Sequence, residues 1–135
     1  MVKKMWIPTP KKNKSSNVPV DLKASVSVKA DTFIQNVLIP KYIKVQNIQE
    51  DHNYLVKIYS KWYRHYFYFC ATYYSPGVNA ISDSFETKFA RMEYVGNGNF
   101  NISYMRHNGL WWEVAQDKNV CDSLTIIQDE GCFMP

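Results

Sequence analysis

The residues that decide the fold run from position 85 to 114 and read FETKFARMEYVGNGNFNISYMRHNGLWWEV. The stretch holds aromatic-rich segments separated by two turn signals, Asn97-Gly98 and Asn108-Gly109. An asparagine followed by a glycine supplies the positive φ angles that tight hairpin turns require. We therefore predict three consecutive antiparallel strands, at about residues 85–95, 100–106 and 110–114.

The register of the first hairpin follows from the side chains that it sets opposite each other. A two-residue turn at positions 97–98 places Glu93 opposite Ile102, whereas a three-residue loop places Tyr94 there. Apolar residues that face each other on one side stabilise a sheet. We therefore predict the three-residue, bulged turn, with Gly98 at positive φ.

The second hairpin leaves two alternatives open, because either Trp111 or Trp112 can point toward the core. Neighbouring residues of a strand point to opposite faces of the sheet. We expect one of the two tryptophans to be largely buried. The other is expected on the opposite face, which is where a ligand would bind.

Helices are predicted on both sides of the strands in the sequence. Apolar residues recur upstream at three- and four-residue spacing, at Leu22, Val26, Ala30, Phe33 and Val37. This periodicity predicts an amphipathic helix of about five turns, which Pro40 ends because proline lacks a backbone N–H. A shorter helix at about residues 120–129 turns Leu124 and Ile127 toward the core.

Two more strands are predicted between the helices, at residues 54–59 and 66–74, with a turn at residues 61–65. Consecutive strands joined by short turns favour a meander. We therefore expect an α+β fold: an antiparallel β-meander of about five strands, with one long N-terminal helix packed on a face and a short C-terminal helix.

The positive charge of the chain is concentrated at its start. Residues 1–17 hold five lysines and no acidic residue, whereas residues 18–135 carry a net charge of −1. We predict a flexible basic tail over residues 1–17 and a single α+β domain over residues 18–135. Such a tail is typically solvated, and contact with phosphate is the alternative.

The sequence predicts a cytoplasmic protein with no membrane partner. No apolar run approaches the ~20 residues that a membrane span needs. Lys3 and Lys4 lead only into a short apolar segment that Pro8 ends, so no signal peptide is predicted. The three cysteines, an odd number, are expected to be reduced thiols.

Several chemistries are disfavoured by the spacing of the reactive residues. Cys70, Cys121 and Cys132 form no short-spaced pair of the kind found in zinc sites, and the three histidines are isolated. Cys70 lies between apolar neighbours, which predicts a core thiol with a raised pKa. We predict no metal, no cofactor and no catalytic residue.

Two Arg-His pairs lie at predicted hairpin ends, at residues 64–65 and 106–107. In a meander, the first and the fourth turn lie at opposite ends of the sheet, so the two pairs cannot form one site. At one end, Arg106 and His107 can converge with Asp51, His52 and the loop at 76–84. Such a group suits acid–base chemistry or anion binding, although polar strand ends are ordinarily just solvated.

The order of several motifs resembles that of a known family. The motifs are Phe-Ala-Arg at 89–91, Met-Arg-His at 105–107, Leu-Trp-Trp-Glu at 110–113 and the closing helix. This order is similar to that of a bacterial family of small proteins known as domain of unknown function 3024, most closely over residues 85–135. The resemblance implies no activity, cofactor or catalytic residue.

Aromatic residues are dense on the predicted strands. Rings beside basic residues are typical of surfaces that stack single-stranded nucleic acid, although small sheets also use rings to build a core. We predict a non-enzymatic binding module that prefers nucleic acid or another acidic partner. The alternatives are a protein-interaction or homo-oligomeric domain that uses an exposed aromatic surface, and an enzyme with a His/Arg site.

The candidate binding residues combine rings and cations on these strands and turns. They are Arg91, Arg106, His107, Trp111, Trp112, Trp62 and Arg64. The feature that would favour binding is an exposed Trp111 or Trp112 beside Arg91 or Arg106.

Overall fold

The computed structural model describes residues 17–43, 54–75 and 84–135. Three helical elements, α2, η1 and α3, precede a five-stranded sheet, and α4 follows it. Their bounds are α2 Val20–Phe33, η1 Ile34–Leu38, α3 Ile39–Tyr42, β1 Tyr54–Tyr63, β2 Tyr66–Tyr74, β3 Ser84–Gly96, β4 Asn99–Met105, β5 Trp111–Lys118 and α4 Val120–Asp129.

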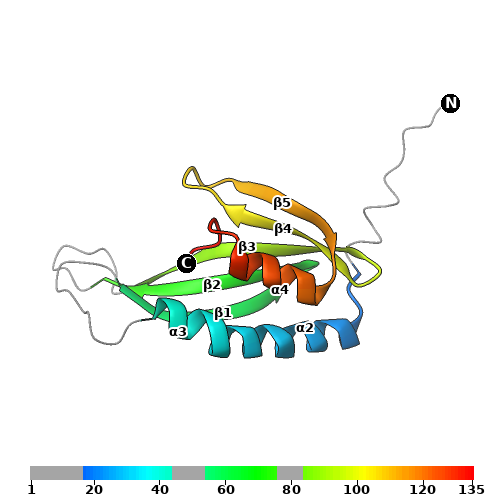
Figure 1. The fold of residues 1–135 in the computed structure, drawn as a ribbon, viewed down its shortest axis with the longest axis horizontal. Helices are drawn as coiled ribbons and strands as arrows, with labels where there is room; N and C mark the ends of the chain where they lie inside the picture. The colour runs from blue at the N-terminus through cyan, green and yellow to red at the C-terminus, as the bar shows by residue number, and fades with distance from the viewer. Residues whose placement is uncertain (1–16, 44–53, 76–83) are drawn as a thin grey trace.

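The sheet is an antiparallel meander in the order β1-β2-β3-β4-β5, and both α2 and α4 pack against the same face of it (Figure 1). The predicted α+β fold is therefore confirmed. Within the described part of the chain, no helix has the length and apolar character needed to cross a membrane. The predicted tail and the loop residues at 44–53 and 76–83 lie outside the described residues.

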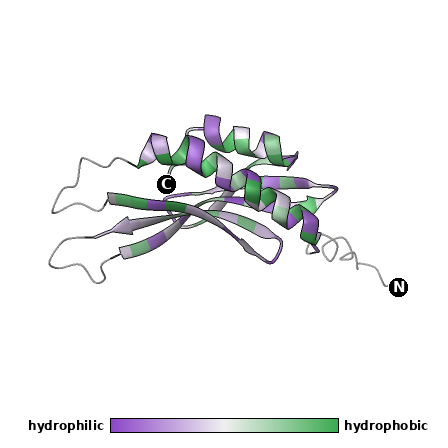
Figure 2. Cartoon of the chain, turned by 90° about the horizontal axis from the view of Figure 1, so that it is seen from below, coloured by the Kyte–Doolittle hydropathy of each residue, from purple (hydrophilic) through white to green (hydrophobic). Residues whose placement is uncertain are grey.

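The core fills the space between this sheet face and the helices. Alternation along β2 turns Phe67 and Phe69 toward the helices, and both are fully buried. Phe33 of α2 meets Phe69 edge-on, with 6.1 Å between the ring centroids. On α4, the predicted inward residue Ile127 is buried as well. Figure 2 shows how apolar and polar residues alternate along the strands and around the helices.

The prediction that Pro40 ends the long helix is wrong. The helical path passes through Pro40 because a π-helical segment, η1, precedes it. The N–H of Ile39 bonds to the carbonyl of Ile34, five residues back rather than four. This wider turn relieves the clash that a proline ring makes with the carbonyl four residues earlier, so that the helix continues to Tyr42.

The first strand is longer than predicted, and the turn after it is shorter. β1 continues to Tyr63, which pairs directly with Tyr66, so only Arg64 and His65 form the turn. Arg64 has a φ of 57°, the left-handed conformation that a tight hairpin turn requires. The expected turn at 61–65 was wrong because Trp62 packs inward on Phe67, with ring centroids 4.9 Å apart.

The register predicted for the β3–β4 hairpin is also wrong. Tyr94 pairs with Phe100, not with Ile102, although apolar residues still face each other. The turn itself has two residues, Asn97 at φ 57° and Gly98 at φ 77°, so the positive φ of Gly98 and the presence of a bulge were predicted correctly, but the loop length was not. The bulge lies in β3 between Tyr94 and Gly96, and there it absorbs the extra residue that we had placed in the loop.

The C-terminal helix has the predicted bounds, and the side chain of Asn119 caps it by accepting a hydrogen bond of 2.8 Å from the N–H of Asp122. The strand before it runs further than predicted, to Lys118 instead of Val114. Its last residues are held by Asn101, whose side chain accepts a hydrogen bond from the N–H of Asp117 at 3.0 Å.

Candidate binding surface

The face of the sheet opposite the helices, which we call the open face, carries rings and cations together. Because Phe67 and Phe69 point into the core, their neighbours Tyr66 and Tyr68 point to the open face. Cross-strand pairing adds further residues to it. They include Lys61 and Tyr63 on β1, Glu86, Lys88, Arg91 and Glu93 on β3, and Trp111 on β5.

Arg91 is the centre of this surface. Its guanidinium lies 4.8 Å from the ring centroid of Tyr66 and 4.9 Å from that of Trp111. Within the described residues, Arg91 has no carboxylate at ion-pair distance, and its buried Nε has no hydrogen-bond acceptor. Ring contacts therefore hold the guanidinium in place, and no carboxylate neutralises its charge.

A third ring, that of Tyr68 on β2, belongs to the same cluster. Tyr68 lies 5.9 Å from Trp111 and 6.0 Å from Tyr66 between ring centroids. Burial raises the pKa of the Tyr66 phenol, with Glu93 adding to the rise and Arg91 opposing it. Glu93 also lies 3.4 Å from His65 Nε2 at the β1–β2 turn. The cluster thus presents neutral rings and one cation that makes no ion pair within the described residues.

A β-bulge shapes the neighbouring part of the open face. Tyr68 pairs with Arg91, but the bulge between Phe69 and Cys70 shifts the pairing so that Cys70 faces Lys88 instead of Phe89. Phe89 is thereby directed inward, where it is 4% exposed, and Lys88 joins the open face. Bulges often re-aim a side chain in this way.

Lys88 lines a hollow of about 380 Å³ together with Lys61, Trp62, Tyr63 and Tyr68. Its ammonium lies 5.8 Å from the ring centroid of Tyr68. Below them, Cys70 is fully buried, and burial raises the pKa of its thiol. The prediction of a core thiol with a raised pKa is therefore confirmed, although the thiol lies on the open side of β2.

The predicted site residues fall into separate groups. Arg91 and Trp111 meet on the open face. Trp62 lies on the opposite face, where its Nε1 donates a 3.3 Å hydrogen bond to the carbonyl of Lys23. Arg64 lies at the β1–β2 turn, with its guanidinium 5.3 Å from the Tyr63 ring centroid.

Arg106 and Trp112 form a group of their own, 4.8 Å from guanidinium to ring centroid. Trp112 pairs with Tyr104, whose ring contacts the buried Phe133, so it lies on the side of the sheet that carries the helices. The tryptophan on the helix side is not the more buried of the two. Trp111, on the open face, is partly buried, whereas Trp112 is 53% exposed, because β5 is an edge strand that no helix covers at Trp112 within the described residues.

The two Arg-His pairs lie at opposite ends of the sheet, as the meander predicts. His107 lies in the β4–β5 turn, far from Arg64 and His65 along the strands. The proposed convergence of His107 with Asp51 and His52 lies outside the described residues. No group of three His, Cys, Asp or Glu side chains suited to a metal ion occurs in the part of the chain that the structure covers.

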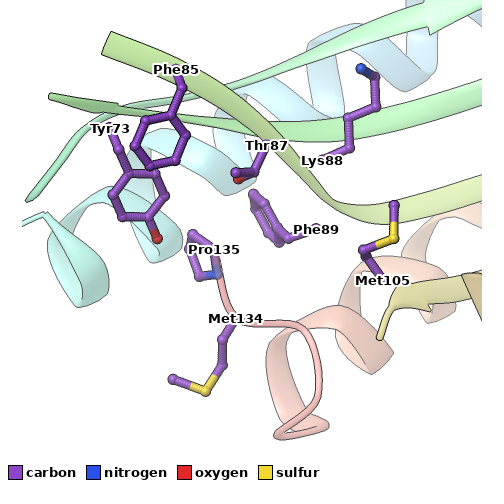
Figure 3. A pocket seen from close by; sticks show the side chains of 8 residues that line it. All are labelled: Tyr73, Phe85, Thr87, Lys88, Phe89, Met105, Met134 and Pro135. Carbon is purple, nitrogen blue, oxygen red and sulfur yellow. The ribbon is translucent and has the colours of Figure 1, made fainter. Parts of the chain in front are cut away.

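A second hollow, of about 360 Å³, lies between β3 and the C-terminal residues (Figure 3). Tyr73 and Phe85 stack along one side of it, with ring centroids 5.4 Å apart. Met134 and Pro135 border it as well, and its lining is mostly apolar. The hydroxyl of Thr87 is buried there without a hydrogen-bond partner. This hollow offers apolar contact and the hydroxyls of Tyr73 and Thr87, but no cluster of titratable groups.

Sequence reasoning missed Lys61 and Lys88 as members of a site. Their residue types alone gave no signal, but Lys61 shares its strand face with Tyr63, which could have drawn attention to it. Lys88 could not be placed, because its face depends on the bulge at Phe89 opposite Cys70.

Comparison with known proteins gives a family and no activity. Neither a curated protein nor a solved structure matches the chain. The model of the family described as "Domain of unknown function (DUF3024)" matches residues 18–135, which is most of the chain. This match confirms the resemblance noted at residues 85–135 and extends it to the long helix and the first strands. The protein therefore belongs to the DUF3024 family.

Proposed function

We propose that the open face binds single-stranded nucleic acid. Bases stack on Trp111, Tyr66 and Tyr68, and the cations beside these rings contact the phosphates. The observation that carries this proposal is the position of Arg91 between Tyr66 and Trp111, with no carboxylate at ion-pair distance among the described residues. Base–aromatic stacking contributes ~1–3 kcal/mol per base and tolerates any sequence.

The distribution of charge over the two sides of the sheet supports the same partner. On the helix-covered side, α4 carries Asp122 and Asp129 and no basic residue. On the open face, Lys88 and Arg91 each lie against a ring. A polyanion is therefore repelled by α4, whereas on the open face these two cations attract it and the carboxylates of Glu86 and Glu93 oppose the attraction. In this proposal the protein is a cytoplasmic, non-enzymatic binding module, and the lysines of residues 1–17 add sequence-independent attraction to phosphate.

Two adjacent tryptophans provide a matched test. Trp111 and Trp112 each contact one arginine, at 4.9 and 4.8 Å, but they lie on opposite faces of β5. We expect Trp111→Ala to weaken binding of a labelled single-stranded oligonucleotide about 5- to 150-fold, as the loss of one stacked base predicts. Trp112→Ala should leave binding unchanged. The measurement is fluorescence anisotropy with DNA and RNA at low and moderate salt.

The same titrations decide against the proposal in two ways. Equal losses in both variants, or no binding by the unaltered protein, would rule out the open face as a stacking surface. Binding that disappears at moderate salt and does not depend on Trp111 would reduce the interaction to attraction between lysines and phosphates.

A second candidate function is self-association through β5. Trp112 and Val114 of this edge strand are 53% and 39% exposed, and Leu110 just before it is 64% exposed. Exposed apolar rows on sheet edges commonly pair with another chain. Sedimentation velocity at several concentrations tests this candidate, since a protein that remains monomeric at the highest concentration would contradict it.

A further inference from the structure

The hollow beside the ring cluster contains two cations that converge on one atom. Lys61 Nζ lies 3.2 Å from Glu86 Oε1, and Lys88 Nζ lies 3.5 Å from the same oxygen. The two lysines come from different strands, β1 and β3, and the sheet register brings them to one point. Two ammonium groups around a single anionic oxygen form the arrangement that a phosphate oxygen also accepts.

We propose that this hollow is the phosphate-binding subsite of the open face, in which Lys61 and Lys88 hold one phosphate and Glu86 takes its place when no strand is bound. The inference rests on the proposed function, because it names the part of the strand that this hollow receives. Glu86 is thereby an internal competitor of the ligand. It lowers the affinity of the empty surface for any single anion.

The charge and exposure of these side chains support the displacement of Glu86 by a phosphate. The lysines and the glutamate together carry a net charge of +1, so the group still attracts an anion. The side chains of Lys61, Lys88 and Glu86 are 43%, 36% and 34% exposed, so solvent reaches all three. Ion pairs as exposed as these contribute ~0–1 kcal/mol, so a phosphate can displace Glu86 at small cost.

The position of the hollow fits a nucleotide better than an isolated carboxylate. Tyr63 and Tyr68 form part of its lining, and the ring of Tyr68 also belongs to the cluster around Trp111. A phosphate between the lysines therefore lies next to a surface on which its base can stack. The volume of about 380 Å³ is within the range of small-ligand pockets.

The sharpest test removes the competitor. Glu86→Gln frees both ammonium groups and removes a negative charge, so we expect it to tighten binding of a labelled oligothymidylate about twofold to fivefold. Lys61→Gln and Lys88→Gln should each weaken it about tenfold, as the loss of a charge-assisted hydrogen bond predicts. Lys57→Gln is the matched control, because it removes the same charge from β1 at a residue outside the hollow.

Salt dependence tests whether the two lysines share one phosphate. Each phosphate contact with a single strand contributes ~0.7 to the slope of log K against log salt. We therefore expect the double variant Lys61→Gln/Lys88→Gln to lower this slope by about 0.7, whereas two separate contacts would lower it by about 1.4. Circular dichroism confirms that each variant is folded before its binding is compared.

Failure of this inference can be distinguished from failure of the proposed function. If Trp111→Ala abolishes binding but Glu86→Gln does not tighten it, and Lys61→Gln behaves like Lys57→Gln, the subsite is wrong and the stacking surface remains. If no oligonucleotide binds, the proposed function fails. The hollow is then judged by NMR, with thymidine 5′-monophosphate as probe and thymidine as control. Shifts at Tyr68 and Lys88 with the monophosphate alone support the subsite, and their absence overturns it.

Discussion

Both faces of the sheet carry aromatic rings but use them differently. On the covered face, Phe67 and Phe69 contact each other at 5.5 Å and a 90° interplanar angle, and both are fully buried. On the open face, Tyr66 and Tyr68 come from the same strand and remain partly exposed. Their neighbours are the cations Arg91 and Lys88 rather than apolar side chains.

This difference shows that the number of aromatic residues says little about function, whereas their polar ends and neighbours say more. Phenylalanine has no polar atom and gains only from burial. Tyrosine and tryptophan present a ring and a hydrogen-bonding group, so they remain useful at a surface that meets water and a ligand. The strands thus divide their rings between stability and binding by alternation alone.

The largest expected effect is on the free energy of unfolding, and it distinguishes two neighbouring residues of β2. Phe67→Ala should lower the free energy of unfolding by about 3–5 kcal/mol, because it leaves a cavity in the core. Tyr68→Ala should lower it by less than half as much, since this ring is partly exposed. Urea unfolding followed by circular dichroism measures both. Equal losses would show that the open face is also part of the core.

Arg91→Lys gives an intermediate effect and tests what holds the open face together. Lysine keeps the charge but loses the flat group that stacks between Tyr66 and Trp111. We expect a loss of ~0.5–1 kcal/mol in the free energy of unfolding, the size of an exposed cation–π contact, and weaker oligonucleotide binding. Binding equal to that of the unaltered protein would show that only the charge at this position matters.

The smallest expected effect is on the pH dependence of stability, and it concerns Cys70, a buried residue on the open face. Burial raises the pKa of its thiol, although Lys61 and Lys88 oppose the rise, so the fold favours the protonated form. The contribution of the protonated thiol to the stability of the fold is therefore complete below the ordinary thiol pKa of 9.0. It is lost as the pH rises through the higher pKa that this thiol has in the folded protein.

Two measurements check this expectation. The free energy of unfolding should fall less steeply above pH 9.0 in Cys70→Ala than in the unaltered protein. An alkylating reagent at neutral pH should modify the exposed Cys121 before Cys70. Modification of Cys70 at the same rate as Cys121 would mean that the open face admits reagents to its centre.

The sequence predicted those elements whose signals are local. The bounds of α4 followed from its flanking residues and its apolar spacing, and the sides of β2 followed from strict alternation. What failed depends on contacts between strands. A bulge at Val95 shifts the β3–β4 register, and a bulge at Phe89 decides that Lys88 faces outward. The position of a bulge depends on how a strand packs against its neighbours, and the residue pattern of the strand alone does not reveal it.

The candidate site was predictable in part for the same reason. Arg91 and Trp111 could be named because each carries a residue type suited to ligands. Trp62 was placed with them although its indole N–H bonds to the backbone of α2 at Lys23. Trp62 points inward because β1 extends past residue 59. The polar residues around Trp62 are typical of a turn, so this extension was not predicted.

The π-helical turn before Pro40 constrains how the length of this chain can change. A π turn contains one residue more than an α turn, so removal of a residue such as Gln35 would restore a regular helix. That shorter helix would then carry a proline in its interior, at a cost of ~3 kcal/mol or more. The extra residue and the proline are therefore tolerated together, and a deletion here requires replacement of Pro40 in the same variant.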